Sequence, residues 1–203
     1  MPKIVDHNER RRHILDAFWR LVERDGANEI SVRHVAAEAG MPKSSIAHYV
    51  GTMPQLLGLA VDDFVATNTE YMISLGLFDL DVDKVTEVLY TLVPVSARRR
   101  SKSGVWLLLA SQAASDPEFA DVLRRLNRFV ADGLEDFLEI MRNQGMIGDG
   151  RDLTIEGRLL HAVIDGLSLE CMTDPLLRDE GDVRAILRAH VINLAQPAPV
   201  RVP

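Results

Sequence analysis

A short predicted helix over residues 43–50 carries polar side chains of the kinds that contact nucleic acid. Ile46 and Val50, four residues apart, are expected to face inward, which leaves a lysine, two serines and a histidine outside. Lysine neutralises phosphates, and serine and histidine can hydrogen-bond phosphates or base edges. These residue types at this spacing predict DNA recognition. The expected DNA-contacting residues are Ser31, Arg33, Lys43, Ser44, Ser45, His48, Tyr49 and Thr52.

The neighbouring residues carry the signals that would position this helix. Ser31 is placed to cap a thin, alanine-rich helix that ends at Gly40, where left-handed backbone is needed. Thr52 and Gln55 form a T-x-x-Q capping box at the start of a longer helix. A thin helix, a glycine turn and a short polar helix form the layout that places its second helix in the DNA major groove.

Residues 8–57 resemble the DNA-binding region of TetR-type transcriptional regulators. The resemblance is carried by Asp25-Gly26, residues 35–40, Lys43, His48-Tyr49, Gly51-Thr52 and Leu56-Leu57. The chain departs from the family pattern at Pro42, Ala47, Val50 and Met53. Met53 stands where the family usually has a lysine that meets a phosphate. The alternative for this stretch is a helical hairpin that serves only as scaffold.

Residues 80–195 resemble the ligand-binding domain of the BetI-like branch of the same family. The resemblance is carried by Trp106 in an apolar helix, residues 114–119, residues 164–169 and Asp174-Pro175. It implies a small-molecule effector. It also implies a dimer in which the last two helices of each copy form a four-helix bundle, with two DNA-reading heads ~34–36 Å apart.

The predicted fold is all-α with about nine helices. An N-terminal three-helix, helix-turn-helix DNA-binding domain is expected over residues 1–55, and a larger helical ligand-binding and dimerisation domain over residues 56–196. Residues 197–203 are expected to be a disordered tail. Apolar residues recur at spacings of three and four through both domains, and Asp81 and Thr154 are placed to cap two of the later helices.

The charge is unevenly distributed along the chain. The net charge is −7, which is unusual for a DNA-binding protein. Residues 1–55 hold 8 Lys and Arg against 7 Asp and Glu, whereas residues 56–203 hold 15 against 23. The excess acid therefore lies outside the predicted DNA-binding domain, and we expect modest non-specific affinity for DNA.

Composition limits the compartment and the cofactors. The single cysteine, Cys171, excludes an internal disulfide and argues against a cysteine-based zinc site, and no metal or other cofactor is expected. The sequence has no apolar run near 20 residues, and its first residues lack an apolar signal core. We therefore expect a cytoplasmic protein with no membrane partner.

Polar residues on otherwise apolar helix stripes predict an effector pocket. Asn68, Gln112 and Asn127 would need partners if buried, and a ligand is one possible partner. Ordinary core packing is the alternative for each residue taken singly. The expected lining residues are Asn68, Tyr71, Trp106, Leu109, Gln112, Asn127 and Phe129. The few aromatic residues favour a mostly apolar effector over a quaternary ammonium ion.

The last two predicted helices carry more apolar surface than one core needs, which predicts a homodimer interface. The expected interface residues are Leu160, Ile164, Leu167, Ile186, His190 and Leu194.

An enzymatic function is worth considering because the sequence contains a histidine, an aspartate and a serine near one another, but it is not expected. His161, Asp165 and Ser168 share one helix face, but a catalytic triad needs its acid and serine on opposite nitrogens of the histidine. The sequence therefore predicts a homodimeric repressor that binds a palindromic double-stranded DNA operator and is released by a small-molecule effector. The alternative is a ligand-binding module that no longer reads DNA, because Ala47 and Met53 replace residues that usually contact phosphate.

Overall fold

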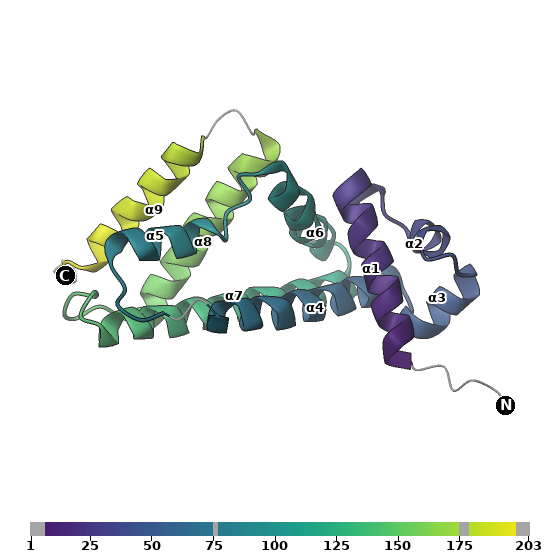
Figure 1. The fold of residues 1–203 in the computed structure, drawn as a ribbon, viewed down its shortest axis with the longest axis horizontal. Coiled ribbons are helices and arrows are strands. Elements are labelled where there is room, and N and C mark those ends of the chain that lie inside the picture. The colour runs from purple at the N-terminus through teal and green to yellow at the C-terminus, as the bar shows by residue number, and fades with distance from the viewer. Residues whose placement is uncertain (1–6, 75–76, 175–178, 198–203) are drawn as a thin grey trace. The chain divides into compact units, whose positions relative to one another are not determined.

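The computed structural model describes residues 7–74, 77–174 and 179–197, with the backbone alone for residues 68 and 70–74. The all-α prediction is confirmed, since the described residues form helices and no strands (Figure 1). The elements are α1 (His7–Asp25), η1 (Ala27–Glu29), α2 (Val32–Glu38), α3 (Lys43–Val50), α4 (Met53–Ser74), α5 (Val82–Tyr90), α6 (Ala97–Ala113), α7 (Pro117–Asn143), α8 (Leu153–Thr173) and α9 (Glu180–Leu194).

The chain divides into two compact units, one over residues 1–70 and 97–126 and the other over residues 71–96 and 127–203. The first unit extends beyond the predicted DNA-binding segment because α1 packs against α6 as well as against α2 and α3. Trp19 on α1 also donates to the Asp63 carboxylate on α4, with Nε1 and Oδ2 3.1 Å apart. The helix-turn-helix is thus built into a larger helical body.

Side-chain caps fix where several helices begin. Ser31 accepts from the amide of His34 and Asp81 from that of Lys84, as predicted. The predicted cap of α8 is wrong by two residues: Asp152, not Thr154, accepts the first free amides of that helix. Thr154 lies inside the first turn, where its hydroxyl donates to Glu135 over 2.7 Å.

The core of the second unit joins four helices. α5 packs against α9 (Figure 1), and their buried residues meet those of α7 and α8 in one apolar cluster. Its fully buried members include Leu89, Leu138, Met141, Leu160 and Leu187.

The C-terminal end of α9 is fastened to the loop between α7 and α8. The amide of Gly148 donates to the carbonyl of Leu194 over 2.8 Å, and a Cβ at Gly148 would lie 2.1 Å from the Gln196 carbonyl oxygen. Only glycine therefore allows this close approach. Arg151 in the same loop is buried and donates to the Asn193 and Gln196 carbonyls and to the Glu156 carboxylate.

Candidate nucleic-acid interface

A tight turn brings α2 and α3 together in the first unit. Gly40 has φ +62°, a conformation that L side chains rarely adopt, and its amide donates to Ala37. Ala36 on α2 and Ala39, the residue that caps its end, are buried, and Ile46 and Val50 are buried on α3. The small alanine side chains allow α3 to lie close, as the sequence predicted.

The other face of α3 is polar and open. Lys43, Ser44 and His48 are exposed, and Ser45 and Tyr49 are half-buried. Arg33 on α2 and Thr52, just before α4, are also exposed. All eight predicted DNA-contacting residues, including Ser31, thus lie in one unit. Their contact with DNA remains a prediction.

The start of α1 is attached to α3 by Arg11 and His7, neither of which is among the eight predicted DNA-contacting residues. The Arg11 guanidinium donates from Nε to the Tyr49 carbonyl over 3.1 Å. The His7 ring lies 5.2 Å from the Tyr49 ring and 6.0 Å from the His48 ring, measured between centroids. His7 and Arg11 are four residues apart, a spacing that shares one helix face, but only the folded chain shows that this face meets α3.

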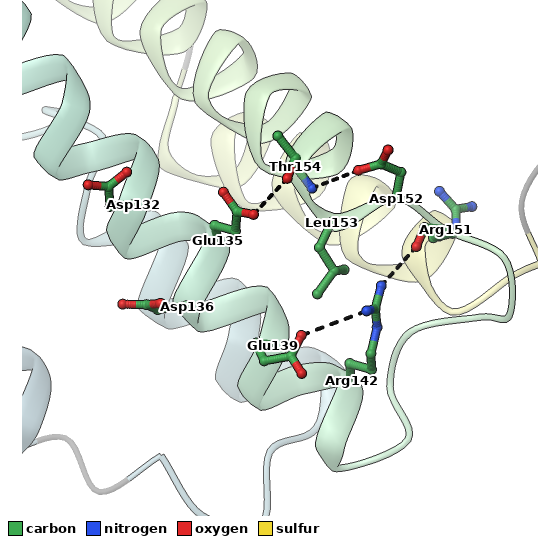
Figure 2. A pocket seen from close by; sticks show the side chains of 9 residues that line it. All are labelled: Asp132, Glu135, Asp136, Glu139, Arg142, Arg151, Asp152, Leu153 and Thr154. Atoms are coloured by element: carbon green, nitrogen blue, oxygen red, sulfur yellow. Dashed lines mark hydrogen bonds and ion pairs between the residues drawn. The ribbon is translucent and has the colours of Figure 1, made fainter.

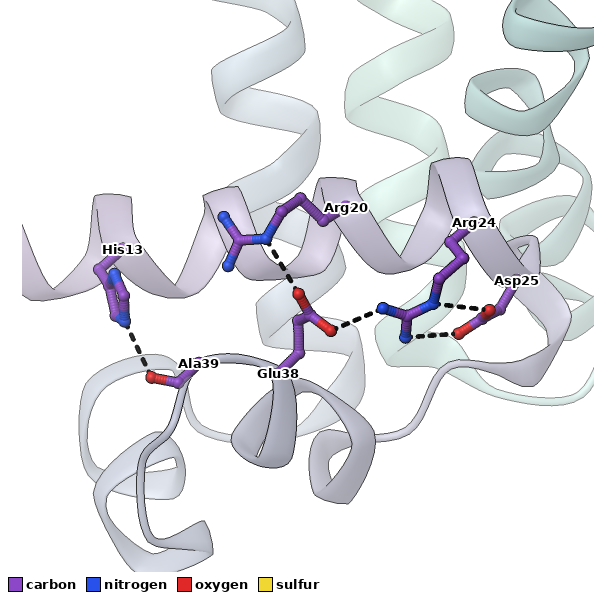
Figure 3. A network of polar contacts seen from close by, with 6 residues as sticks. All are labelled: His13, Arg20, Arg24, Asp25, Glu38 and Ala39. Atoms are coloured by element: carbon purple, nitrogen blue, oxygen red, sulfur yellow. Dashed lines mark hydrogen bonds and ion pairs between the residues drawn. The ribbon is translucent and has the colours of Figure 1, made fainter.

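An ion-pair network fixes α2 on α1 (Figure 3). Glu38 on α2 receives Arg20 Nε at 3.0 Å and Arg24 Nη1 at 2.9 Å. These hydrogen bonds, first from Arg20 and then from Arg24, lower the pKa of Glu38. Arg24 also pairs with Asp25 and lowers the pKa of that carboxyl, while both acids raise the pKa of the Arg24 guanidinium. Because the pKa values of Glu38 and Asp25 are lowered, both carboxylates stay charged to a lower pH than free carboxyl groups would.

The turn after α2 has a separate tie to α1. The His13 Nε2 lies 2.9 Å from the Ala39 carbonyl oxygen (Figure 3). The two ties hold α2 and the turn that leads into α3 in a fixed place on α1.

The start of α4 lacks the positive charge that the rest of this surface carries, and an acidic side chain lies beside it. Met53 is half-buried where a lysine would have offered a cation. The Thr52 amide donates to the Gln55 side chain over 3.0 Å, as the predicted capping box requires. The Thr52 hydroxyl lies 3.4 Å from the Glu118 carboxylate, to which it donates. An acid thus lies beside this helix start.

The predicted effector-pocket residues fall in both units. Trp106 is half-buried, Leu109 is fully buried and Gln112 is exposed, all in the first unit. Asn127 and Phe129 are half-buried in the second unit. The side chains of Asn68 and Tyr71 lie outside the described residues. The pocket stays a prediction. Gln112 was expected to be a buried polar residue in need of a partner, but its side chain is exposed.

A hollow of about 600 Å³ lies in the second unit, on the outer side of α7 and the start of α8 (Figure 2). Its lining is mostly acidic, and several of the acids have partners: Glu135 accepts from Thr154, and Glu139 lies 3.7 Å from Arg142. Leu153 is its one apolar lining residue. It does not coincide with the predicted pocket.

Four of the six predicted dimer residues are core residues of the single chain. Leu160, Ile164, Leu167 and Leu194 are at most 5% exposed and belong to the apolar cluster of the second unit. Ile186 and His190 are partly buried. Other large apolar residues are exposed on these helices: Ile155, Leu159 and Leu169 on α8, and Ile192 on α9.

Two titratable groups on α8 and α9, Asp165 and His190, have pKa values shifted by burial. His161 Nε2 lies 3.6 Å from the Asp165 carboxylate one turn away, and partial burial raises the pKa of Asp165. Burial lowers the pKa of His190, whose Nε2 has no hydrogen-bond partner among the described residues. Ser168 is buried.

Two kinds of feature are absent from the described part of the chain. None of its helices is both long and apolar enough to cross a membrane. No group of three or more His, Cys, Asp or Glu side chains in the same ranges is placed to hold a metal ion.

The model of the C-terminal domain of BetI-type transcriptional repressors matches residues 82–196, more than half of the chain. The chain belongs to the TetR family of transcriptional regulators. This confirms the family resemblance of the sequence, and the chain is a DNA-binding transcriptional regulator of that family. That α2 and α3 form its DNA-reading helix-turn-helix remains a prediction.

Full-length relatives agree with this assignment. The HTH-type transcriptional regulator PksA of Bacillus subtilis is 27% identical over 192 residues, which cover 94% of this chain and 92% of PksA. Two solved structures share the fold of this TetR-family chain. A TetR-family regulator from Rhodococcus sp. has a TM-score of 0.76 at 20% identity, over 93% of this chain and 99% of its own. A regulator from Saccharomonospora viridis, solved in complex with choline, has a TM-score of 0.70 at 21% identity, over 92% and 95%.

Proposed function

We propose that this TetR-family regulator is a homodimeric repressor that binds a palindromic operator and releases it when a small-molecule effector binds. The observation that carries the proposal is the open polar face of α3, held in place through Gly40, Glu38 and His13. A recognition helix must be rigid to read base edges, because a base contact discriminates only at a defined distance. The ties of α2 and of its turn to α1 supply that rigidity.

A second copy of the chain would give the regulator its two reading heads. We propose that the partner covers the exposed residues Ile155, Leu159 and Leu169 on α8 together with Ile192 on α9. Exposed apolar patches of this kind mark interaction surfaces. A two-fold dimer places identical heads on the two halves of a palindrome, one DNA turn apart.

The effector would act by shifting a population of conformations. It must bind better to a state in which the two heads no longer match the operator spacing, since only differential affinity can move the equilibrium. We propose that this effector binds within residues 56–196. An apolar compound and choline, the ligand of the Saccharomonospora viridis regulator, are the two effector types to compare in an operator-release assay.

Electrophoretic mobility shift with the DNA that flanks the regulator's own gene tests the proposal. Retention of one flanking fragment against excess competitor DNA is the expected result. The rival function is a ligand-binding module that no longer reads DNA. If neither the flanking DNA nor any duplex selected from a random library is retained specifically, the rival holds.

Lys43 provides a quantitative prediction for this assay. It is exposed at the first position of α3, where it is expected to meet a phosphate. Lys43→Ala should weaken binding to all sequences alike and reduce the slope of log K against log salt by ~0.9, the value for one lost phosphate contact. Lys84→Ala on α5 is the control, because Lys84 donates to the Asp79 carbonyl in the other unit. An unchanged slope in Lys43→Ala would remove Lys43 from the interface.

A further inference from the structure

Three aromatic rings meet at the edge of the proposed reading surface. His7 is on the first turn of α1, and His48 and Tyr49 are on the last turn of α3. The ring centroids are 6.0 Å apart for His7 and His48, 5.2 Å for His7 and Tyr49, and 5.2 Å for His48 and Tyr49. Both imidazoles are exposed, and Tyr49 is half-buried.

The position of His7 is determined by the attachment of α1 to α3. The Arg11 guanidinium, one turn further along α1, donates to the Tyr49 carbonyl. This contact and the ring contacts hold the start of α1 beside the end of α3. A helix that enters the major groove with the His48 face would therefore carry His7 to the same stretch of DNA backbone.

The surrounding charges are mostly fixed and positive. Besides Tyr49, the charged and titratable groups on α1 and α3 within six residues of His7 or His48 are Glu9, Arg10, Arg11, Arg12, His13 and Lys43. Glu9 is the one acid in the first turn of α1. Two imidazolium ions only 6.0 Å apart would repel each other and these cations, whereas an anion between them would reverse that cost.

We propose that His7 and His48 together bind one phosphate of the operator and take up protons as they do so, so that DNA affinity rises as pH falls from 8 to 6. The inference rests on the proposed function, because it needs α3 at the DNA. It adds His7 to the DNA-binding surface and makes this contact dependent on pH.

The size of the effect follows from linkage. Imidazole gains its proton near pH 6.5 when unperturbed. If DNA favours the protonated form of one ring tenfold, affinity rises about sixfold between pH 8 and pH 6. If both rings contribute in this way, the two sixfold gains multiply to a rise in DNA affinity of about 40-fold between pH 8 and pH 6.

The test is fluorescence anisotropy with a duplex selected from a random library by the full-length protein, from pH 6 to pH 8 at constant ionic strength. The wild type should gain about 40-fold, His7→Gln and His48→Gln about sixfold each, and the double variant little. His34→Gln is the matched control: it is an exposed histidine of the same unit whose Nδ1 lies 2.6 Å from the Glu29 carbonyl oxygen, and it should behave as wild type. His161 and His190 are present in every variant, so their contribution cancels.

His7→Lys separates charge from structure. A permanent cation at this place should raise affinity at pH 8 and leave only the pH dependence of His48. A loss of affinity in His7→Gln that is the same at every pH would show that His7 only supports the fold, and would overturn the inference. A double variant that keeps the wild-type pH dependence would also overturn it. Absence of specific binding at every pH would instead reject the proposed function.

Discussion

Replacing Leu159 by Glu should leave each chain folded and convert the regulator into monomers that no longer retain the operator. Leu159 is 52% exposed on α8, so a carboxylate there stays hydrated in the single chain. In a dimer that covers this face, the same carboxylate would be buried without a partner, at a cost of several kcal/mol. A monomer has one reading head and loses the second half of the operator contacts.

Sedimentation velocity and mobility shift on the same samples measure both effects. Phe78→Glu is the matched control, because Phe78 is 81% exposed in the loop before α5 and lies outside the α8–α9 face. It should stay dimeric. Leu167→Glu places the same charge in the core, where Leu167 is 5% exposed, and should unfold the second unit instead. A Leu159→Glu protein that sediments as a dimer would contradict the proposed face.

Arg151→Met should lower the free energy of unfolding by about 3–5 kcal/mol, the usual cost of removing one partner of a buried ion pair. The Arg151 side chain is 3% exposed, and its Nη1 lies 2.7 Å from the carboxylate of Glu156, whose side chain is 10% exposed. Methionine would fill a similar volume but leave the Glu156 charge buried alone. The carbonyls of Asn193 and Gln196 would also lose their donor.

Urea unfolding followed by circular dichroism measures the loss. Arg124→Met is the matched control, because Arg124 forms an exposed pair with Asp121 at 2.5 Å and should cost less than about 1 kcal/mol. Arg151→Met/Glu156→Leu should recover at least about half of the loss, because it removes both charges. If Arg151→Met is as stable as Arg124→Met, the buried pair does not hold this region together.

Local sequence signals predicted the helix-turn-helix well because they act over a few residues. The Ser31 cap, the Gly40 turn and the inward pair Ile46 and Val50 each depend on neighbours within one or two turns. The all-α class follows in the same way from helical periodicity. His7 could not be found by such reasoning, since its place beside Tyr49 depends on a contact between residues far apart in sequence.

The sequence alone could not predict which face of α8 is buried in the core. This helix has apolar residues on two stripes, one with Leu160, Ile164 and Leu167 and the other with Ile155 and Leu159. Periodicity shows that both stripes are apolar but not which one faces α5, α7 and α9. The structure buries the first stripe and exposes the second. Gln112 raised the same difficulty, because its exposure depends on packing.

The last helix of a chain usually frays at its end, and its backbone amides there exchange with deuterium quickly. The carbonyls of Asn193 and Leu194 at the end of α9, and that of Gln196 just beyond it, accept from Arg151 and Gly148. Opening the last turn of α9 therefore requires the loop between α7 and α8 to detach and the buried Arg151–Glu156 pair to separate. We expect the amides of Ala195 and Gln196, which donate to Ile192 and Asn193, to exchange almost as slowly as those in the middle of α8. In Arg151→Met they should exchange at the rate of a frayed helix end.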